Sequence, residues 1–281
     1  MYISDRDTGG SRRPSLFICP VCGEPLFRGE SGLACRNGHS FDRARSGYVN
    51  LLTGRPPKLE GDTKEMVSAR SAFLEKGFYS PLRAELERIS AEFPQGTLLD
   101  AGCGEGWFLE GIASTRPTAA VDLSKFAADT AAKRLRVKIS PSVEVAVASV
   151  YKLPLADGSV SVLQSVFAPW CGAEFRRLLP SGGILVVAVP GEAHLEELKR
   201  VIYDEPPHPE PKEHRHEGFE LIGEREIVSR VGLSDPGDAL SLYQMTPHSR
   251  NAKAHPERLA TESLRTVTTA FDVAVYRRTS D

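Results

Sequence analysis

Alternating strand-like and helix-like segments, which begin at Thr97, constrain the fold of this chain more than any other feature. The strand-like segments are short, apolar and rich in β-branched residues: TLLDAG, TAAVD, VEVAVAS, SVSVLQSVFA and GILVVAVP. Segments with helical character, such as LSKFAADTAAKRL and EAHLEELKRVIYDE, separate them. This order is typical of a doubly wound parallel sheet with helices on both faces, so we predict an α/β fold. A final β-rich segment, TVTTAFDVAVYRR, is expected at the sheet edge as a hairpin strand.

The composition adds few restrictions. A length of 281 residues suffices for one large domain or two smaller ones, and a net charge of −2 requires no nucleic acid, membrane or acidic partner. No apolar run approaches the roughly 18 residues of a membrane-spanning helix, and the N-terminus lacks an apolar signal core. The five cysteines form an odd number. We therefore expect a cytoplasmic protein that binds neither DNA nor a membrane, with clustered cysteines for metal or redox chemistry.

A metal site is predicted near the N-terminus, in the segment CPVCGEPLFRGESGLACRNGH. Cys19 and Cys22 form a C-x-x-C pair, and Cys35 and His39 follow as a C-x3-H pair after a gap of twelve residues. Two close ligand pairs separated by a short loop suit tetrahedral Zn²⁺, and four ligands leave no open position for catalysis. We predict a structural zinc finger. The alternatives are a chance cluster of buried thiols and, less favoured, a redox C-x-x-C.

Basic residues follow the cysteine cluster, with Phe41 and Tyr48 interleaved and only Asp42 opposing them. A basic surface with aromatic side chains can hold phosphates and stack bases. The other interpretation, a solvated face whose aromatics belong to the core, is slightly favoured when this segment is taken alone. The basic residues are Arg36, Arg43, Arg45, Arg55 and Lys58.

Two helices are expected after the Gly- and Pro-rich linker TGRPPKLEGD. Asp62 with Glu65 predicts a capping box for TKEMVSARSAFLEK, and Ser80 with Pro81 predicts the start of PLRAELERISAEF. Further along, the segment DEPPHPEPKEHRHE is expected to be an exposed loop. Its three histidines could bind a metal, which is the less favoured interpretation.

The glycine-rich turn in LLDAGCGEGWFLEGIA carries the chemistry. Asp100 ends a strand directly before the turn, and Asp122 ends the next strand, eighteen residues after Gly104. A pyrophosphate would be repelled by Asp100, whereas a cationic ligand group would not, and an acid at the end of the second strand can hold ribose hydroxyls. Glycine lets the backbone approach the ligand closely. This combination favours S-adenosylmethionine over NAD as the ligand. The alternative interpretation is an ordinary strand–turn–helix in which the acids only cap the backbone.

We expect the cofactor to contact both acids, the glycine turn and the ends of neighbouring strands. This region resembles that of S-adenosylmethionine-dependent methyltransferases, and the resemblance implies that Ala148 and Ser149, at the end of a strand, frame the adenine. Tyr79 and Arg70 are expected near the methionyl end. Cys103 and Cys171 lack a partner at metal spacing and are interpreted as buried thiols. The predicted cofactor-binding residues are Asp100, Gly102, Cys103, Gly104, Gly106, Trp107, Asp122, Leu123, Ala148, Ser149, Tyr79 and His194.

From Cys19 to about Tyr276 the chain resembles the RlmA-type 23S rRNA (guanine-N1)-methyltransferases. The segments that carry the resemblance are HSFDRARSGYVNLL, EMVSARSAFLEKGFYSPL, DAGCGEG, VFAP, VPGEAHLEEL and LYQMTP, in this order and spacing. The resemblance implies a class I S-adenosylmethionine-dependent methyltransferase, with a Rossmann-like doubly wound sheet and an N-terminal zinc-finger domain. It also implies methylation of guanine N1 in a hairpin loop of bacterial 23S rRNA, by a homodimer.

The family has two branches that choose neighbouring guanines, and one of them includes macrolide-resistance enzymes. The linker RPPKLEGDT resembles the resistance-linked branch and LKRVIYDE resembles the other, so the branch stays open. We expect a zinc-binding, RNA-docking domain over residues 1–55, a linker and helices over 56–94, and the methyltransferase domain over 95–281.

Guanine N1 must lose its proton before or during attack on the methyl group, and such enzymes can rely on geometry as much as on a strong base. His194 is a candidate proton acceptor, and an equally favoured interpretation is that it is an ordinary histidine on a helix surface. His248 is a weaker candidate. Phe167 and Pro169 are expected to stack on a flipped base. The predicted catalytic residues are thus His194, Phe167 and Pro169.

Two other functions remain in play: a small-molecule methyltransferase with a purely structural zinc module, and a binding protein with a lapsed cofactor site. The basic residues of the finger favour an rRNA enzyme over the small-molecule methyltransferase. The intact glycine turn with both acids argues against the binding protein.

Overall fold

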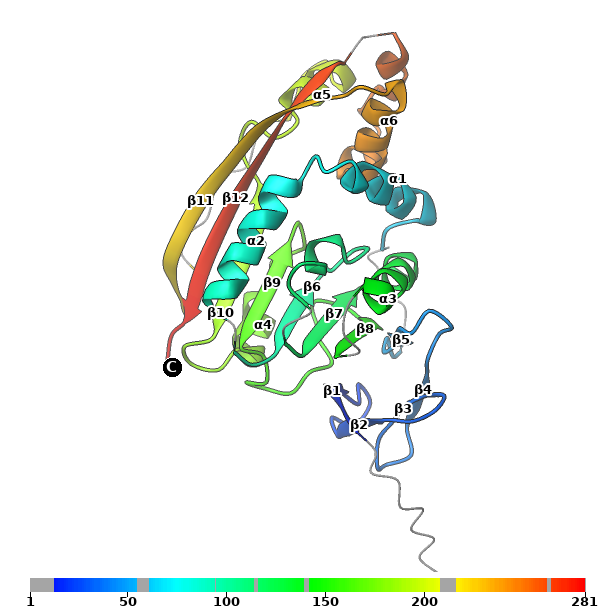
Figure 1. The fold of residues 1–281 in the computed structure, drawn as a ribbon, viewed down its shortest axis with the longest axis vertical. Helices are drawn as coiled ribbons and strands as arrows, with labels where there is room; N and C mark the ends of the chain where they lie inside the picture. The colour runs from blue at the N-terminus through cyan, green and yellow to red at the C-terminus, as the bar shows by residue number, and fades with distance from the viewer. Residues whose placement is uncertain are drawn as a thin grey trace, which may run out of the picture.

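The computed structural model describes residues 13–54, 61–93, 95–113, 116–138, 142–207, 216–261 and 264–280. Its strands form a small sheet near the N-terminus and a large sheet that carries the remaining strands (Figure 1). Among these residues, no helix is both long and apolar enough to cross a membrane.

The small sheet, here called the ribbon, has four antiparallel strands in chain order. They are β1 (Pro14–Ile18), β2 (Pro25–Arg28), β3 (Gly32–Ala34) and β4 (Ser40–Asp42). At Gly32 a Cβ atom would overlap the carbonyl oxygen of Phe41 on the neighbouring strand, so this close pairing requires glycine.

The large sheet has eight strands in the order β11-β12-β10-β9-β6-β7-β8-β5. They are β5 (Val49–Asn50), β6 (Leu98–Ala101), β7 (Thr118–Asp122), β8 (Val143–Val147), β9 (Val162–Val166), β10 (Ile184–Pro190), β11 (Phe219–Gly232) and β12 (Thr266–Arg278). The five predicted strands are β6 to β10, and all of them pair in parallel. Because the chain order reverses between β6 and β9, the sheet is doubly wound, as predicted.

The expected edge position of β12 is wrong. This strand lies between β10 and β11 and is antiparallel to both. More than half of its residues are buried, because both faces of the sheet are covered at this position. The edge belongs instead to β11, which the sequence reading missed, because its charged segment EREIVSR lacks the apolar character of the other strands.

Six α-helices and three short 3₁₀ helices accompany the strands in the described part of the chain. They are α1 (Lys64–Glu75), α2 (Ser80–Glu92), α3 (Lys125–Lys138), α4 (Gly172–Leu178), α5 (Glu196–Ile202), α6 (Pro236–Met245), η1 (Trp107–Leu109), η2 (Pro247–Arg250) and η3 (Pro256–Ala260). The start of α2 agrees with the prediction, since Pro81 lies in its first turn. The helix expected from Glu192 begins only at Glu196, because Leu195 has a φ of 54°.

The predicted capping box of α1 is wrong. Thr63 is the N-cap, and its side chain accepts a hydrogen bond of 3.3 Å from the backbone N–H of Met66. Asp62 lies one residue before the cap, and its carboxylate pairs with Arg70 instead. The linker expected before α1 falls largely on residues 55–60, outside the described residues, and so do His208 and His214 of the histidine-rich segment.

Both faces of the large sheet are covered. On one face the core includes Leu86 of α2 and Ala131 of α3, and on the other it includes Phe175 of α4 together with Phe17 of the ribbon. The ribbon therefore packs into the core of the second face. The expected domain limits at residues 55 and 95 stay predictions.

Glu144 of β8 fastens the ribbon to the large sheet. Its carboxylate accepts hydrogen bonds from the hydroxyl of Ser15 (2.6 Å), the backbone N–H of Leu16 (2.9 Å) and the guanidinium of Arg28 (2.7 Å). The Glu144 side chain is 10% exposed, so these bonds are shielded from water. Next to this contact, β5 extends the large sheet by pairing in parallel with β8.

We predict that Glu144→Ala lowers the free energy of unfolding by about 2–3 kcal/mol, since hydrogen bonds to a partly buried charge contribute about 1.5–3 kcal/mol. Urea unfolding followed by circular dichroism measures the change. Glu220→Ala is the matched control, because Glu220 is 61% exposed and should change the free energy by less than about 0.5 kcal/mol. Equal unfolding midpoints for the two variants would contradict this role of Glu144.

Candidate functional site

The four predicted metal ligands meet at one end of the ribbon. Cys19 and Cys22 come from the turn between β1 and β2, and Cys35 and His39 from the turn between β3 and β4. Their ligand atoms all lie within 4.8 Å of one another. The Sγ atoms of Cys22 and Cys35 are 3.8 Å apart, and His39 Nδ1 lies 3.5 Å from Cys19 Sγ and 3.4 Å from Cys35 Sγ.

These distances suit tetrahedral Zn²⁺. With Zn–S bonds of about 2.3 Å and a Zn–N bond of about 2.0 Å, a tetrahedron separates two sulfurs by about 3.8 Å and sulfur from nitrogen by about 3.5 Å. The backbone N–H of Glu24 lowers the pKa of Cys22 to about 6, which favours the thiolate that a metal binds. Three thiolates and an imidazole would fill the coordination of this ion and leave no open position, so the residues suit a structural zinc site.

The glycine turn follows β6 and is built by backbone conformations that other residues rarely adopt. Gly102, Gly104 and Gly106 have φ values of 89°, 54° and 76°. A Cβ atom at Gly102 would lie 2.5 Å from the Cβ of Ala168, in the loop after β9. Glycine therefore allows the turn and this loop to approach each other at the carboxyl ends of β6 and β9. The turn leads into the short 3₁₀ helix η1.

Asp122 lies beside the glycine turn, at the end of β7. Its carboxylate accepts hydrogen bonds from the backbone N–H of Gly104 (2.9 Å) and of Ser124 (2.7 Å). Burial raises its pKa, while these N–H groups and the charge of Arg70 act against the rise. Each carboxylate oxygen keeps a second lone pair, so the group can still accept bonds from two ribose hydroxyls.

Asp100 is 1% exposed at the carboxyl end of β6. Its Oδ2 accepts a hydrogen bond of 3.3 Å from the amide of Gln164, while Oδ1 is buried without a hydrogen-bond partner among the described residues. Burial raises the pKa of Asp100 to about 8, and the charges of Asp122 and Glu105 add to the rise. A cationic ligand group, such as the amino group of a methionyl moiety, fits this orphaned carboxylate.

The other predicted cofactor residues surround these acids to different degrees. Ala148 is buried, and its backbone N–H donates to the carbonyl of Asp122 (3.0 Å), next to Ser149 and Leu123. Cys103 is a buried thiol whose pKa is raised by burial, which agrees with an unreactive role. Trp107 belongs to the core, with the guanidinium of Arg83 4.9 Å from its ring centroid. Their contacts with a cofactor stay predictions.

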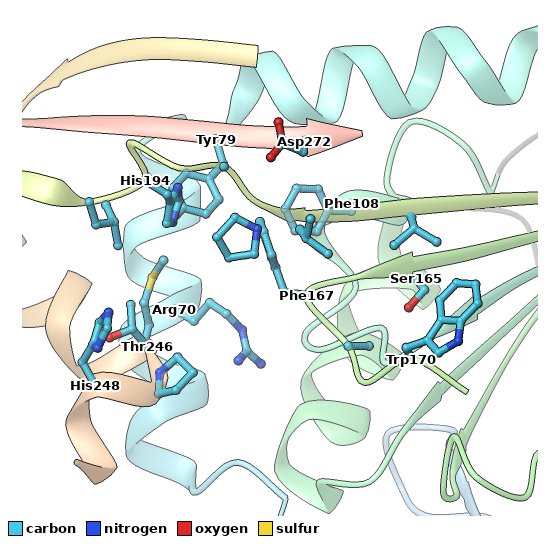
Figure 2. A pocket seen from close by; sticks show the side chains of 18 of the residues that line it. Arg70, Tyr79, Phe108, Ser165, Phe167, Trp170, His194, Thr246, His248 and Asp272 are labelled. Carbon is cyan, nitrogen blue, oxygen red and sulfur yellow. The ribbon is translucent and has the colours of Figure 1, made fainter. Parts of the chain in front are cut away.

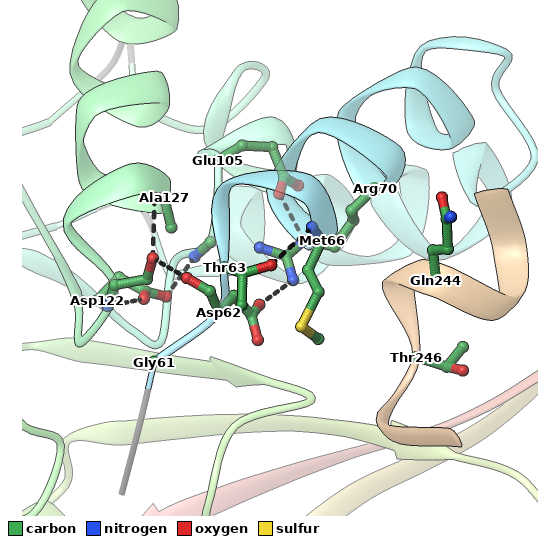
Figure 3. A network of polar contacts seen from close by, with 12 residues as sticks. Gly61, Asp62, Thr63, Met66, Arg70, Glu105, Asp122, Ala127, Gln244 and Thr246 are labelled. Atoms are coloured by element: carbon green, nitrogen blue, oxygen red, sulfur yellow. Dashed lines mark hydrogen bonds and ion pairs between the residues drawn. The ribbon is translucent and has the colours of Figure 1, made fainter. Parts of the chain in front are cut away.

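A polar network closes over the glycine turn from α1 (Figure 3). Arg70 donates to the carboxylate of Glu105 (2.5 Å) and also pairs with Asp62. The hydroxyl of Ser124 donates to the backbone carbonyl of Asp62 (2.6 Å), which ties the start of α1 to the end of β7. Sequence patterns could not reveal this network, because its members come from separate segments and form no motif.

A cavity of about 900 Å³ opens beyond the carboxyl ends of β9 and β10. Figure 2 shows Tyr79, Phe167, His194 and Asp272 around it. Phe167 and Leu195 are the two non-glycine residues with positive φ in the described chain, and both line this cavity. Such conformations cost about 1–2 kcal/mol and cluster at functional sites. Ala168 and Trp170 line the cavity too, whereas Pro169 between them does not.

His194 lines the cavity, but its ring nitrogens are engaged. Nδ1 accepts a hydrogen bond of 3.2 Å from the backbone N–H of Ala270, and Nε2 lies 3.2 Å from the hydroxyl of Tyr79. Burial lowers the pKa of His194 to about 4, so the ring is neutral near pH 7. This geometry argues against the expected role as proton acceptor. His248 also lines the cavity, and its Nδ1 is bonded to the hydroxyl of Tyr203 (2.9 Å).

Residues that the sequence analysis did not select form the rest of the wall. Asp272 of β12 is buried, and Glu224 lines the cavity from β11. The rings of Trp170 and His216 stack with centroids 3.8 Å apart, and Tyr276 lies beside them. Asp272 could have been singled out only by its place in an otherwise apolar strand, TAFDVAV.

Known proteins share both parts of this arrangement. Residues 17–55 match the zinc-ribbon family model described as RlmA, N-terminal, and residues 99–187 match the one described as Methyltransferase domain. A protein of Micromonospora griseorubida named as a 23S rRNA (guanine-N(1)-)-methyltransferase is 42% identical over 205 residues, 64% of this chain and 67% of the relative.

Two further relatives agree. The 23S rRNA (guanine(748)-N(1))-methyltransferase of Streptomyces fradiae is 41% identical over 188 residues, 64% of this chain and 65% of the relative. A Bacillus subtilis protein named as a 23S rRNA (guanine-N(1)-)-methyltransferase is 34% identical over 206 residues, 69% of this chain and 71% of the relative. The chain belongs to this methyltransferase family. Its matches span about two thirds of the length of these relatives.

The fold is also found in a solved structure from Bacillus halodurans that is described as a methyltransferase. It matches with a TM-score of 0.52 and 15% identity, and covers 70% of this chain and 99% of that chain. The ribbon with its ligand cluster and the sheet with its glycine turn thus suit the two groups predicted from the sequence, Zn²⁺ and S-adenosylmethionine.

We predict one zinc ion per purified chain. Cys22→Ser replaces a thiolate by a poor zinc ligand and should reduce the bound zinc to well below one equivalent, measured by elemental analysis. Cys103→Ser is the matched control and should retain the metal, because Cys103 lies at the glycine turn. Full zinc content in Cys22→Ser, or none in the unmodified chain, would contradict the site.

We predict that S-adenosylmethionine binds more tightly as pH rises towards 8 and then levels off. Below pH 8 the Asp100 carboxyl is largely protonated, and a cation favours the ionised form, so binding there must release a proton. Calorimetric titrations from pH 6 to 9 measure the effect. Asp100→Asn should lose this part of the pH dependence while keeping the part that comes from the ligand. Identical pH profiles for both proteins would exclude Asp100.

Proposed function

We propose that this protein transfers a methyl group from S-adenosylmethionine to N1 of a guanine in a hairpin of 23S rRNA. The observation that carries the proposal is the cavity of about 900 Å³ next to the glycine turn, which combines aromatic walls with a buried acid. Membership of the family favours an rRNA substrate over a small molecule.

The cofactor would lie along the carboxyl ends of β6, β7 and β8. Asp122 would hold the ribose hydroxyls, Ala148 and Ser149 would frame the adenine, and Asp100 would face the amino group. Arg70, whose guanidinium would lie 3.1 Å from a Cβ at Gly104, is placed for the carboxylate of the methionyl end. When bound, the sulfonium supplies an electrophilic methyl group, and its C–S bond breaks with the electron pair left on sulfur.

The target base would enter the cavity from the other side. Its walls are aromatic, and the Phe167 ring is 40% exposed. A base that leaves the helical stack is held by stacking and by hydrogen bonds to its edge, which Phe167 and the neighbouring polar groups can provide. Pro169 does not line the cavity, so its position gives no support to the predicted stacking role.

Asp272 is proposed to accept the N1 proton. The N1–H and N2 amino groups of guanine are donors, and a carboxylate is the side chain that accepts from both at once. Asp272 is 5% exposed on β12, opposite Val189 of β10, and lines the cavity. A carboxylate at hydrogen-bond distance can accept the proton before the N1–C bond forms, which frees the N1 electron pair that attacks the methyl group. This assignment replaces His194, whose nitrogens are engaged.

The ribbon is proposed as the RNA-docking module. Arg36 and Arg43 are exposed on it, where they can contact phosphates. Phe41 and Tyr48 pack against the core, so this surface would bind the backbone without stacking bases. Arg55 and Lys58 lie outside the described residues. The homodimer, the cytoplasmic location and any part in antibiotic resistance stay predictions.

We predict that the active protein produces a reverse-transcriptase stop one nucleotide before a guanine of a 23S rRNA hairpin, because a methyl group on N1 blocks the pairing edge. The measurement is primer extension on rRNA from cells with and without the protein. Asp272→Asn should reduce methylation by about 10²- to 10⁴-fold, the usual contribution of a general base.

Glu224→Gln is the matched control for this test. Glu224 lines the same cavity from the neighbouring strand but is exposed, so methylation should change by less than about threefold. Absence of any enzyme-dependent stop in 23S rRNA would overturn the rRNA function. Full activity of Asp272→Asn would overturn the role of that carboxylate alone.

A further inference from the structure

The hydrogen-bonding state of His194 can be deduced from its surroundings. A backbone N–H can only donate, so the bond of 3.2 Å from Ala270 makes Nδ1 an acceptor. In the neutral ring Nε2 therefore carries the proton. The Nε2–H group consequently donates to the hydroxyl oxygen of Tyr79, 3.2 Å away.

The backbone fixes His194 in this position. Its N–H donates to the carbonyl of Gly191 (3.0 Å), and the next residue, Leu195, has a φ of 54° and donates its N–H to Thr268 (2.8 Å). A strained backbone persists only where the surrounding structure determines it, so the ring is held rigidly. It therefore sets the direction of the Tyr79 hydroxyl.

The Tyr79 hydroxyl still has a proton to donate. The side chain is 3% exposed and packs against the rings of Phe271 (centroids 4.7 Å apart) and Phe167 (6.2 Å). In the described chain the Tyr79 hydroxyl has one hydrogen-bond partner, His194. The Nε2–H of His194 occupies a lone pair of the hydroxyl oxygen, so the hydroxyl proton is still available for donation. A buried donor left without an acceptor is unfavourable, and Tyr79 lines the cavity, so a ligand in the cavity is the natural acceptor.

We propose that Tyr79 donates a hydrogen bond to O6 of the target guanine, and that His194 is the positioning residue that aims the hydroxyl. The proposal rests on the proposed function. When N1 gives its proton to the acceptor, the negative charge spreads from N1 to O6. A fixed donor at O6 stabilises this charge as it develops, as an oxyanion hole does. The N1 lone pair then forms the N–C bond, which leaves a neutral methylated base.

The methionyl carboxylate is the competing acceptor, and Tyr79 was expected at that end of the cofactor. Arg70 already places a cation at the glycine turn, where that carboxylate would lie. The ring of Tyr79 instead contacts Phe167, on the side where the base enters. The competing role predicts a loss of cofactor affinity, which can be measured separately.

The test compares two hairpin RNAs of the 23S target sequence, one with guanine and one with 8-azaguanine at the modified position. The analogue keeps O6, N1 and N2, but its N1 proton is more acidic, so it needs less help from a donor at O6. Tyr79→Phe should lower kcat on guanine by about 10²-fold, as removal of one oxyanion-hole donor does. On 8-azaguanine the loss should be under about tenfold, with affinity for S-adenosylmethionine unchanged within twofold.

Variants of His194 test the positioning role. If His194 acts through Tyr79, His194→Ala should lower kcat in the single variant but should add nothing to Tyr79→Phe in the double variant. His194→Gln keeps an N–H donor and should retain more activity than His194→Ala. A purely structural role would instead give additive losses.

Equal losses on the two RNAs, or a defect confined to cofactor affinity, would overturn the proposal for Tyr79. Additive losses in the double variant would overturn the role of His194. If the unmodified protein methylates neither RNA, the proposed function fails, and that result is distinct from a failure of the Tyr79 assignment.

Discussion

The close approach of Gly102 to Ala168 is the constraint on which the rest of the site depends. The sheet reverses its strand order between β6 and β9, so the loops that follow these two strands leave from adjacent positions. A side chain at Gly102 would collide with Ala168 and force the loops apart. With glycine there, the turn beside Asp100 and the loop that carries Phe167 meet, and a cofactor at one can reach a base at the other.

Strand β12 supplies the opposite wall because it runs antiparallel between β10 and β11. Three consecutive residues contribute different groups. The backbone N–H of Ala270 orients His194, the ring of Phe271 packs against Tyr79, and Asp272 reaches the cavity. Successive side chains of a strand point to opposite faces, so one segment can support the core and line the site together.

The sequence predicted the parallel strands and the zinc ligands because both leave short, regular patterns. The edge position predicted for β12 is wrong, because the neighbours of a strand depend on contacts with segments far along the chain, which a local pattern does not contain. The same limit applies to His194. The sequence makes His194 a candidate base, and only the hydrogen bond from Ala270 shows that its Nδ1 lone pair is engaged. Asp272 escaped notice because a single acid in a strand has no motif.

The ribbon and the sheet share one core, which bears on how an RNA could be positioned. Phe17 of the ribbon packs in the same cluster as Val121 of β7, and β5 continues the large sheet beside β8. Glu144 adds charged hydrogen bonds across the junction. An exposed arginine on the ribbon is therefore held at a fixed distance from the cavity. Phosphate contacts carry little sequence information, so this fixed distance would select which nucleotide of a bound hairpin reaches Phe167.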